Sequence, residues 1–364
     1  MKQKRNILLT GVTGFLGAHL FQLMIKEKNN NVFVLMRSKN GVVAEQRLSS
    51  LVADYLKRKD ISRRVQVIHG DITKKNLGIN PKHFNFLYGN INEIYHCAAN
   101  TQFRGPLEIM RKINVEGTRN ILNFSTKCHK LKKINYVSTV FIVGNSGGVF
   151  SEDYKIERKQ KFNNSYEKSK YESELLIKYY REKGVPINIF RPSIITGEYG
   201  TGKTTKFKMF YEPLHFIYMG IFNKIPAHYQ TFHNIIPVDV AAKAIYILAS
   251  NIYRSDTFHI ISQQNKVLGD FYEKASKYFG FKMPDFVPVE KFDMKSLTYI
   301  QKQIISPFIN YFNFKATFTG EKTISILRKL HFQYPPIDDK YYERIFNFCE
   351  VSHFIKKKII KDNG

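Results

Sequence analysis

Thr10-Gly11-Val12-Thr13-Gly14-Phe15-Leu16-Gly17 joins a short apolar run, residues 6–10, to a segment with helical apolar spacing, residues 14–28. Glycines at a strand-to-helix turn permit a tight bend, close approach of the backbone to a pyrophosphate, and close packing of the helix on the strand. The phosphate then lies at the helix amino terminus, where free N–H groups and the helix dipole favour negative charge. Because the pattern stands between the first strand and the first helix, it predicts a dinucleotide site rather than a purely structural turn. The candidate contacts are Thr10, Gly11, Thr13, Gly14, Phe15, Leu16 and Gly17.

The same alternation of short β-branched runs and longer amphipathic segments continues along the chain. The runs predict strands at Asn6–Thr10, Val32–Met36, Val65–His69, Glu93–His96, Ile134–Val137 and Ile187–Phe190. The segments between them predict helices at Gly14–Lys28, Ala44–Lys57, Leu107–Lys127 and Tyr166–Glu182. Strand–helix alternation of this kind is typical of βαβ units, so we expect an α/β fold with a Rossmann-type, doubly wound parallel sheet.

Beyond about residue 197 the regular alternation of predicted strands and helices is interrupted. A Phe/Tyr-rich segment, Phe207–Phe232, precedes a helix predicted at Val238–Ser250 and a strand predicted at Thr257–Ile261. The remainder reads as helices without a strand rhythm. We therefore expect residues 1–200 to form the nucleotide-binding domain, 201–236 a substrate-region insertion, 237–262 a return to that domain, and 263–364 a smaller, mainly helical substrate or lid region.

Composition narrows the class of protein. With 43% hydrophobic residues in 364, the chain can bury a sizeable core, which excludes wholesale disorder. Its three cysteines share no close spacing, so we expect neither a disulfide framework nor a metal site. No apolar run approaches the roughly 18 residues of a membrane span, and the apolar run after the basic amino terminus, residues 7–11, is too short for the core of a signal peptide. We expect a cytoplasmic protein.

The charge is strongly positive: 57 Lys and Arg against 30 Asp and Glu give +27. Such an excess favours anionic partners such as nucleic acid, an anionic membrane face or an acidic protein. The basic residues are spread along the chain and no nucleic-acid motif is present, so we expect no nucleic-acid function. The run Phe354–Ile360 is interpreted either as a weak basic membrane anchor or, preferably, as a lysine-rich tail.

The end of the second strand indicates which dinucleotide binds. An NAD enzyme places an acidic residue there to hold the ribose 2′-hydroxyl, whereas this chain has Arg37. Arg37 can pair with a 2′-phosphate, as can Arg47 on the next helix, so the sequence predicts NADP(H). The alternative is that Arg37 is one of many surface cations.

Two further strand ends fit a nucleotide crevice. Asp71 and Ile72 follow the third strand, where Asp71 can meet the adenine amino group. Ala98 and Ala99 follow the fourth strand, where small side chains let the backbone approach the cofactor. The neighbouring Cys97 is interpreted as a small buried wall residue rather than as a catalytic thiol.

The candidate chemistry lies in Tyr166 and Lys170, four residues apart and therefore on one helix face. A phenol has a pKa of about 10, which a neighbouring ammonium lowers, so we expect Lys170 to depress the pKa of Tyr166. Thr139, at the end of the fifth strand, supplies a second hydroxyl for the same substrate oxygen. Tyr179 and Lys183 repeat the spacing, but they lie at the far end of the helix and are disfavoured.

A second pattern competes with this interpretation. Gly197–Thr204 satisfies the P-loop pattern, which would make the chain an ATPase or kinase with Lys203 on the phosphates. Pro192 interrupts the strand before it, a poor helix follows it, and the first turn already holds a dinucleotide site. We therefore disfavour the P-loop.

In this order the motifs resemble those of the extended short-chain dehydrogenase/reductase superfamily, over roughly residues 5–262. The similarity is greatest to the male-sterility branch, which contains fatty acyl-CoA reductases and the thioester reductase domains of carboxylic acid reductases and peptide synthetases. The resemblance implies that Thr139, Tyr166 and Lys170 are catalytic, that Pro192 and Ser193 border the nicotinamide, and that Asn114 sets a proton relay or the position of Lys170. It rests on the first turn, Arg37, Arg47, His69-Gly70-Asp71, Tyr95–Ala99, Asn114–Thr118, Tyr136–Thr139, the Tyr166/Lys170 pair, Arg191-Pro192-Ser193, Ile236–Ala241 and Phe258–Ile261.

The function implied is reduction by NADPH of an acyl thioester, on CoA or on an acidic acyl carrier protein, to an aldehyde. Further reduction to the alcohol, the acyl group and the oligomeric state stay open. Phe207–Phe232 is predicted either to line an acyl tunnel or to pack on the sheet as ordinary helix. The alternatives are an NADP-dependent alcohol or ketone dehydrogenase of the hydroxysteroid or dihydroflavonol type, then a nucleotide-sugar epimerase, and from another class a binding protein without catalysis.

Overall fold

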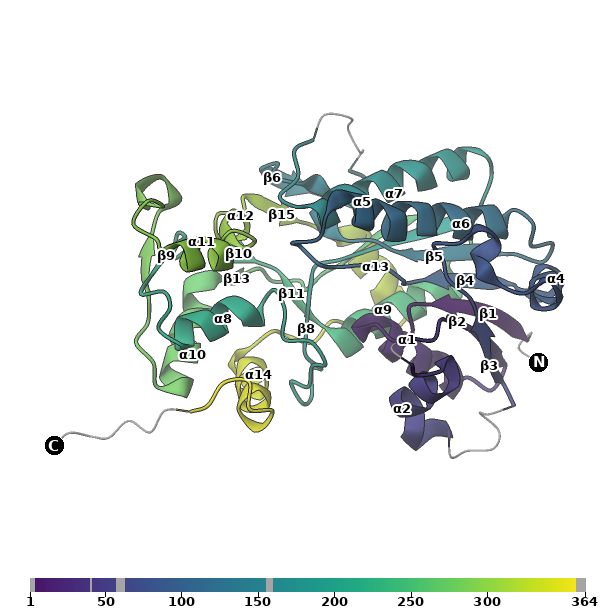
Figure 1. Cartoon of the computed structure of the whole chain (residues 1–364), viewed down its shortest axis with the longest axis horizontal. Helices are drawn as coiled ribbons and strands as arrows, with labels where there is room; N and C mark the ends of the chain where they lie inside the picture. The colour runs from purple at the N-terminus through teal and green to yellow at the C-terminus, as the bar shows by residue number, and fades with distance from the viewer. Residues whose placement is uncertain (1–3, 40, 57–62, 155–159, 358–364) are drawn as a thin grey trace.

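The computed structural model describes residues 4–39, 41–56, 63–154 and 160–357. Its centre is a seven-stranded sheet with the strand order β12-β7-β5-β4-β1-β2-β3, in which every pairing is parallel (Figure 1). The predicted doubly wound sheet is thereby confirmed. The strands are β1 (Arg5–Thr10), β2 (Asn30–Met36), β3 (Val65–His69), β4 (Glu93–His96), β5 (Lys133–Val137), β7 (Ile187–Pro192) and β12 (Thr257–Ile260).

Both faces of the sheet are buried under helices, which explains why its strands are continuous apolar runs. Along β1, Ile7 and Leu9 enter the apolar cluster of one face, and Leu8 enters that of the other, as the period of two requires. The first face is covered by α1 (Phe15–Lys26), α9 (Val238–Asn251) and α13 (Glu321–Lys329); the second is covered by α4 (Pro81–Asn90), α6 (Glu116–Ser125) and α7 (Ser165–Glu182); α2 (Ala44–Leu56) follows β2. Lys57, the expected last residue of α2, lies outside the described residues.

The segment between β4 and β5 departs from the single predicted helix over residues 107–127. It forms α5 (Leu107–Met110), a π-helical turn η2 (Arg111–Val115) and then α6. A π-turn widens the helix by one residue and is often found at functional sites. Here it carries Asn114, which is 2% exposed, into the interior.

The second part of the molecule has its own apolar core, rich in Phe and Tyr, to which α8, α10 and α14 contribute (Figure 1). Short strands also occur there, although only helices were expected beyond residue 262. β15 pairs with β6, which lies far earlier in the chain, and a three-residue strand carries no periodicity by which it could be predicted. The elements are η1 (Lys75–Gly78), η3 (Val140–Val143), β6 (Gly148–Phe150), β8 (Ile194–Thr196), α8 (Tyr211–Tyr218), β9 (Lys224–Pro226), β10 (Phe232–His233), β11 (Ile235–Pro237), β13 (Lys266–Val267), α10 (Leu268–Phe279), β14 (Asp285–Val287), η4 (Val289–Lys291), α11 (Tyr299–Ile305), α12 (Ile309–Phe312), β15 (Ala316–Phe318) and α14 (Asp339–Val351).

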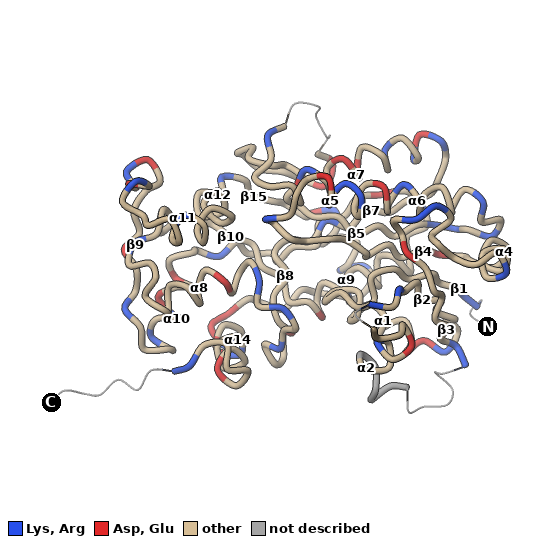
Figure 2. Tube along the Cα trace, in the orientation of Figure 1, with Lys and Arg blue, Asp and Glu red and all other residues tan. Residues whose placement is uncertain are grey.

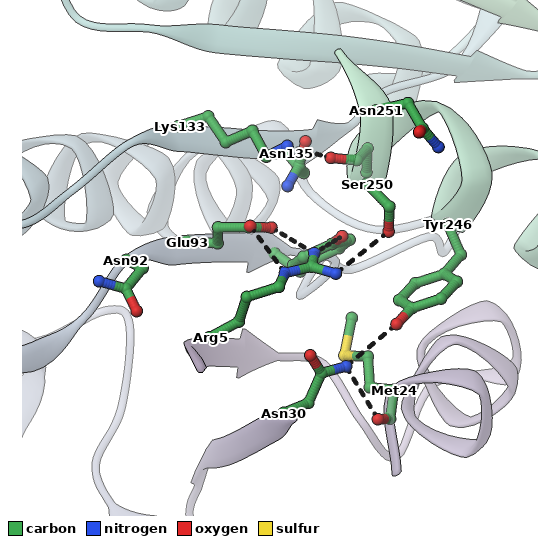
Figure 3. Close-up of polar contacts among 12 residues, drawn as sticks. Arg5, Met24, Asn30, Asn92, Glu93, Lys133, Asn135, Tyr246, Ser250 and Asn251 are labelled. Atoms are coloured by element: carbon green, nitrogen blue, oxygen red, sulfur yellow. Dashed lines mark hydrogen bonds and ion pairs between the residues drawn. The ribbon is translucent and has the colours of Figure 1, made fainter. Parts of the chain in front are cut away.

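A polar network fastens the amino ends of the strands (Figure 3). Arg5 of β1 forms a bidentate pair with Glu93 of β4, at 2.9 and 2.7 Å, and reaches Ser250 of α9 at 3.3 Å. Lys133 of β5 donates to the carbonyls of Ala249 and, at 3.2 Å, Ile252, and burial lowers its pKa to about 8. These contacts tie α9 to three strands at the end of the sheet opposite the strand carboxyl ends, so their role is structural.

Among the described residues, no helix is long and apolar enough to cross a membrane. Basic side chains are spread over both parts of the molecule rather than gathered in one segment (Figure 2). Residues 358–360 of the possible basic anchor lie outside the described part of the chain.

Candidate active site

A cavity of about 370 Å³ opens at the carboxyl ends of the central strands. Parallel sheets bind nucleotides at this edge, where the strand order reverses. The order reverses here between β1 and β4, and Gly11 and Ala98 line the cavity from the two sides of that point. Most of the cofactor contacts predicted from the sequence line this cavity: Thr10, Gly11, Thr13, Gly14, Arg37, Arg47, Asp71, Ile72, Ala98 and Ala99.

The glycines of the first turn are needed for close approach. Gly11 has a φ of +79°, and a Cβ on it would lie 2.5 Å from the backbone nitrogen of Ala98. A Cβ on Gly17 would lie 2.2 Å from the Gly11 carbonyl, so Gly17 serves helix–strand packing. Leu16 is buried in the sheet core and Phe15 packs edge-on against His19, so neither side chain lines the cavity. The turn has the shape that a dinucleotide pyrophosphate requires.

Arg37 and Asp71 form an ion pair at the end of the cavity beside β2. Their side chains are 3.1 Å apart, and Arg47 donates a hydrogen bond to the Arg37 carbonyl at 2.5 Å. Burial disfavours the charged form of Asp71, but hydrogen bonds from Thr73 and Arg37 outweigh it and lower the pKa of that carboxyl. The pair places a guanidinium at the strand end where the ribose is expected.

Tyr166, Thr139 and Lys170 converge beside the ends of β5 and β7. Thr139 caps η3, and the first turn of α7 carries Tyr166. Burial and the Glu167 charge raise the pKa of Tyr166, and a hydrogen bond with Thr139 partly opposes them. The two hydroxyls are therefore within reach of one shared substrate oxygen.

Lys170 does not interact with Tyr166 in the way the sequence predicted. Its Nζ donates to the Tyr136 hydroxyl at 2.6 Å and to the Val137 carbonyl at 2.7 Å. Burial lowers the pKa of Lys170 to about 7, and the charge of Glu174 partly opposes this. Lys170 is not among the groups that shift the pKa of Tyr166, so the predicted depression is absent from this arrangement and the phenol stays protonated at neutral pH.

The remaining predicted residues surround this group. Asn114 accepts a hydrogen bond from the Asn100 backbone at 2.8 Å and donates to Ser169 at 2.8 Å, which links the loop after β4 to α7 one residue before Lys170. Asn114 itself is not among the residues that line the cavity. Pro192 ends β7, and the buried Ser193 hydroxyl has no hydrogen-bond partner among the described residues. An orphaned hydroxyl at this edge fits a polar group of a bound cofactor.

The competing Tyr179 lies outside this group. It is 50% exposed near the end of α7 and contacts Lys183, whose Nζ is 4.3 Å from the ring centroid. It is therefore distant from the strand carboxyl ends, as the position in the helix predicted.

Two aromatic residues that sequence reasoning did not single out cover Tyr166. Phe103 stacks between Tyr166 and Tyr311, with ring centroids 6.0 and 5.4 Å apart. The Tyr311 hydroxyl donates to Glu167 and accepts from Asn164 at 2.7 Å, which anchors the carboxyl-terminal part on the catalytic helix. No local pattern relates Tyr311 to residues almost 150 positions earlier.

The Phe207–Phe232 segment mostly forms ordinary apolar core, but this core is not the one on the sheet that its second interpretation predicted. Phe210, Tyr211, Leu214 and Ile217 are buried in the core of the second part, against residues of α10 and α14. Its last residue, Phe232, lines a small cavity of about 40 Å³ together with Phe141 and Tyr311. The aromatic wall next to Tyr166 thus comes mainly from other segments.

We expect the buried carboxyl group of Glu167 to make the stability of the protein depend on pH. Burial raises its pKa from 4.5 to about 7, although Tyr311 and Asn163 donate hydrogen bonds that oppose the shift. The folded state then binds this proton more tightly than the unfolded state, so its contribution to the free energy of unfolding falls as the pH rises from about 4.5 to about 7. Glu167→Gln removes that dependence, and the stability of the variant relative to the original should rise by about 3 kcal/mol across this window. Urea unfolding of both proteins at several pH values measures it; a constant difference would contradict the assignment.

Beneath the hydroxyl pair, Glu174 holds a buried ion pair that the sequence analysis did not identify. Arg191 of β7 donates to its carboxylate at 3.1 and 2.8 Å, and Ser138 donates to it at 2.5 Å. The two ionic side chains are at most 4% exposed. Because Ser138 precedes Thr139, the pair fixes the backbone that carries the second hydroxyl.

A glycine turn on a cavity at the strand carboxyl ends, with a Tyr, a Lys and a Thr hydroxyl nearby that do not themselves line it, is the arrangement of an oxidoreductase of the extended short-chain dehydrogenase/reductase type. The chain belongs to the male sterility protein family, whose sequence model of an NAD-binding domain matches residues 9–245. The resemblance inferred from the motifs is confirmed, and the relatives in this family are thioester reductase domains and fatty acyl-CoA reductases.

Individual proteins to which the chain is similar are consistent with this family. The chain is 25% identical over 359 residues to a linear gramicidin synthase polypeptide of Brevibacillus parabrevis, a match that covers 94% of this chain and 7% of that protein. It is 29% identical over 145 residues to fatty acyl-CoA reductase 1 of Rattus norvegicus, which covers 38% of this chain and 28% of that protein. The chain thus spans less than a third of the length of either relative. In fold it is similar to the terminal R domain from the myxalamid PKS-NRPS pathway, with a TM-score of 0.85, 24% identity, and 99% and 94% of the two chains covered.

Proposed function

We propose that the chain reduces an acyl thioester to its aldehyde with NADPH. The observation that carries the proposal is that Thr139 is hydrogen-bonded to Tyr166 and that Lys170, held at the end of β5, interacts with Cys97 in the wall of a cavity that Arg37 also lines. The family supplies the class of substrate, because its members include thioester and fatty acyl-CoA reductases.

The side chains support a reaction in the direction of reduction. A bound reduced dinucleotide supplies the hydride that the thioester carbon receives. As charge builds on the carbonyl oxygen, Thr139 and Tyr166 donate hydrogen bonds to it, and Tyr166 transfers its proton. The Tyr166 phenol is protonated at neutral pH and so has a proton to donate, although burial raises its pKa and makes it a weaker acid than an exposed phenol. Lys170 would hold the nicotinamide ribose.

The tetrahedral product of that step is a hemithioacetal. Its C–S bond breaks as the C=O bond re-forms, the hydroxyl proton returns to Tyr166, and the thiolate leaves and takes up a proton. The balance is one hydride and one proton consumed, and one aldehyde and one thiol released. Release of thiol distinguishes this reaction from reduction of a ketone, which has no leaving group.

Arg37 is expected to set the preference for the phosphorylated cofactor. Arg37→Gln should weaken NADPH binding about tenfold or more and leave NADH binding within about twofold, because a hydrogen bond between charged groups contributes about 1.5–3 kcal/mol. Equilibrium binding of both cofactors measures it. Arg119→Gln, which removes an exposed cation paired with Glu116 on α6, is the control and should change neither. Equal weakening of both cofactors by Arg37→Gln would contradict the assignment.

The thioester carrier is CoA or an acidic acyl carrier protein, since a chain with a net charge of +27 favours either anionic partner. NADPH absorbance followed with a panel of acyl-CoAs, with free thiol captured in the same sample, tests the function. One thiol per NADPH indicates the aldehyde, and one per two indicates the alcohol. If no acyl-CoA is consumed, a carrier-protein thioester is tested next; turnover of ketones alone would replace the proposal with the dehydrogenase alternative.

A further inference from the structure

The P-loop-like segment Gly197–Thr204 uses its glycines for packing rather than for binding a phosphate. Gly202 has a φ of +69°, and a Cβ on it would lie 2.1 Å from the Arg344 carbonyl of α14. A Cβ on Gly197 would lie 2.1 Å from the Gly202 carbonyl, and Tyr341 of α14 donates to the Gly197 carbonyl at 2.8 Å. The glycines are therefore required for close packing of the segment on itself and on α14.

The same segment contacts the helix that follows the dinucleotide turn. Within the segment, Glu198 donates its N–H to the Lys203 carbonyl at 2.9 Å and accepts from Gly202 at 2.8 Å, which closes the loop. The Glu198 carboxylate lies 3.2 Å from Nε2 of His19, on α1. The loop therefore packs between α14 and α1, and the amino end of α1 faces the cofactor cavity.

Thr204, the last residue of this loop, stabilises the turn that follows it. Its side chain is 5% exposed, and its hydroxyl both donates to the Lys206 carbonyl at 3.1 Å and accepts from the Lys206 N–H at 3.2 Å. In a P-loop this hydroxyl would hold a metal ion. Here it fixes the turn that carries Lys206.

Lys206 lines the dinucleotide cavity from the second part of the molecule. It shares the wall with Arg37, Lys39 and Arg47, and Asp71, the acidic residue among the described lining residues, is already paired with Arg37. Partial burial and the charges of Lys208 and Lys39 lower the pKa of Lys206, so the ammonium groups are close enough to repel one another. A phosphate dianion bound between Lys39 and Lys206 would remove that repulsion.

We propose that Lys206 is a further binding residue for the 2′-phosphate of the dinucleotide, brought to the cavity by the loop that packs between α1 and α14. The inference rests on the proposed use of NADPH and extends it. Lys39 and Arg37 mark the 2′-phosphate end of the cavity because both follow β2, whose end meets the adenosine ribose in this fold.

The test uses fragments of the cofactor, so it does not depend on turnover. Binding of 2′,5′-ADP and 5′-AMP to the full chain is measured by calorimetry for the original protein, Lys206→Gln, Lys206→Arg and Lys208→Gln. Lys208→Gln removes the same charge two residues away, at a side chain that does not line the cavity. Thermal unfolding of each variant confirms that it is folded.

Lys206→Gln should weaken 2′,5′-ADP about tenfold and leave 5′-AMP within about twofold, Lys208→Gln should change neither by more than about twofold, and Lys206→Arg should restore most of the affinity. Equal effects of the two Gln variants, or equal weakening of both nucleotides by Lys206→Gln, would overturn the inference. If the original protein binds 2′,5′-ADP no more tightly than 5′-AMP, the NADPH preference itself fails. If it prefers 2′,5′-ADP and Lys206→Gln keeps that preference, the role of Lys206 alone fails.

Discussion

Tyr166→Phe should lower the kcat for thioester reduction by about 10²–10⁴-fold while cofactor affinity changes by less than about twofold. Removal of the phenolic proton leaves the developing oxyanion with Thr139 as its remaining hydroxyl donor and deletes the acid of the reaction. The phenyl ring keeps the stack with Phe103, whose centroid lies 6.0 Å from that of Tyr166, so the fold around it should persist. Single-turnover oxidation of NADPH, with equilibrium binding measured in parallel, separates chemistry from binding.

Tyr179→Phe is the matched control on the same helix. Tyr179 has the same relation to Lys183 that Tyr166 has to Lys170, yet it is half exposed and far from the cavity. Its substitution should leave kcat within about twofold of the original. If Tyr166→Phe retained full turnover, or if both variants lost activity equally, the assignment of Tyr166 would be wrong. Retained activity of Tyr166→Phe with loss in Tyr179→Phe would move the chemistry to the other pair.

Glu174→Gln should lower the free energy of unfolding by about 3–5 kcal/mol. The substitution leaves the Arg191 guanidinium, 4% exposed, without its carboxylate, and the loss of one partner of a buried pair costs far more than the pair contributes in total. The glutamine keeps one oxygen for the Ser138 hydroxyl, but its amide NH2 takes the place of the oxygen that accepts from Arg191 at 2.8 Å, so two donors face each other there. Urea unfolding with the midpoint and the m-value recorded together measures the change.

An exposed ion pair between α7 and η2 provides the comparison. Glu172 lies two residues earlier and pairs with Arg111 at 2.6 Å, with the two side chains 21% and 46% exposed. Glu172→Gln should cost about 0–1 kcal/mol, because water screens an exposed pair and replaces its contacts. A Glu174→Gln variant no less stable than Glu172→Gln would show that the Glu174–Arg191 pair is not needed to hold β7 and α7 together.

Much of the fold was readable in the sequence because the relevant physics is local. A parallel strand buried on both faces is a short apolar run, and the six strands expected before residue 191 all occur within a few residues of their predicted bounds. The first turn was recognisable because the backbone conformation and the close contacts that require glycine there involve only a few neighbouring residues. The φ of +79° at Gly11 is an example. The spacing of Tyr166 and Lys170 likewise places both in the first turns of α7 without reference to the rest of the chain.

The sequence is ambiguous in places where a local pattern has more than one physical cause. Lys170 was expected to act on Tyr166, but its ammonium is held by Tyr136 and the Val137 carbonyl, which only the packing of α7 on β5 brings within reach. The glycines of the P-loop-like segment serve contacts with α14, so the same letters that bind phosphate elsewhere here allow two backbones to approach.

The sequence by itself determined the sheet, the dinucleotide turn and the residues that are candidates for the chemistry. Only the tertiary structure decided what covers them. Phe103 and Tyr311 on Tyr166, Arg191 on Glu174, and Lys206 in the cofactor cavity all come from segments that lie next to the site in space but not along the chain. Such contacts form because side chains fill the space left between packed elements, and that space is a property of the folded chain rather than of any short stretch of it.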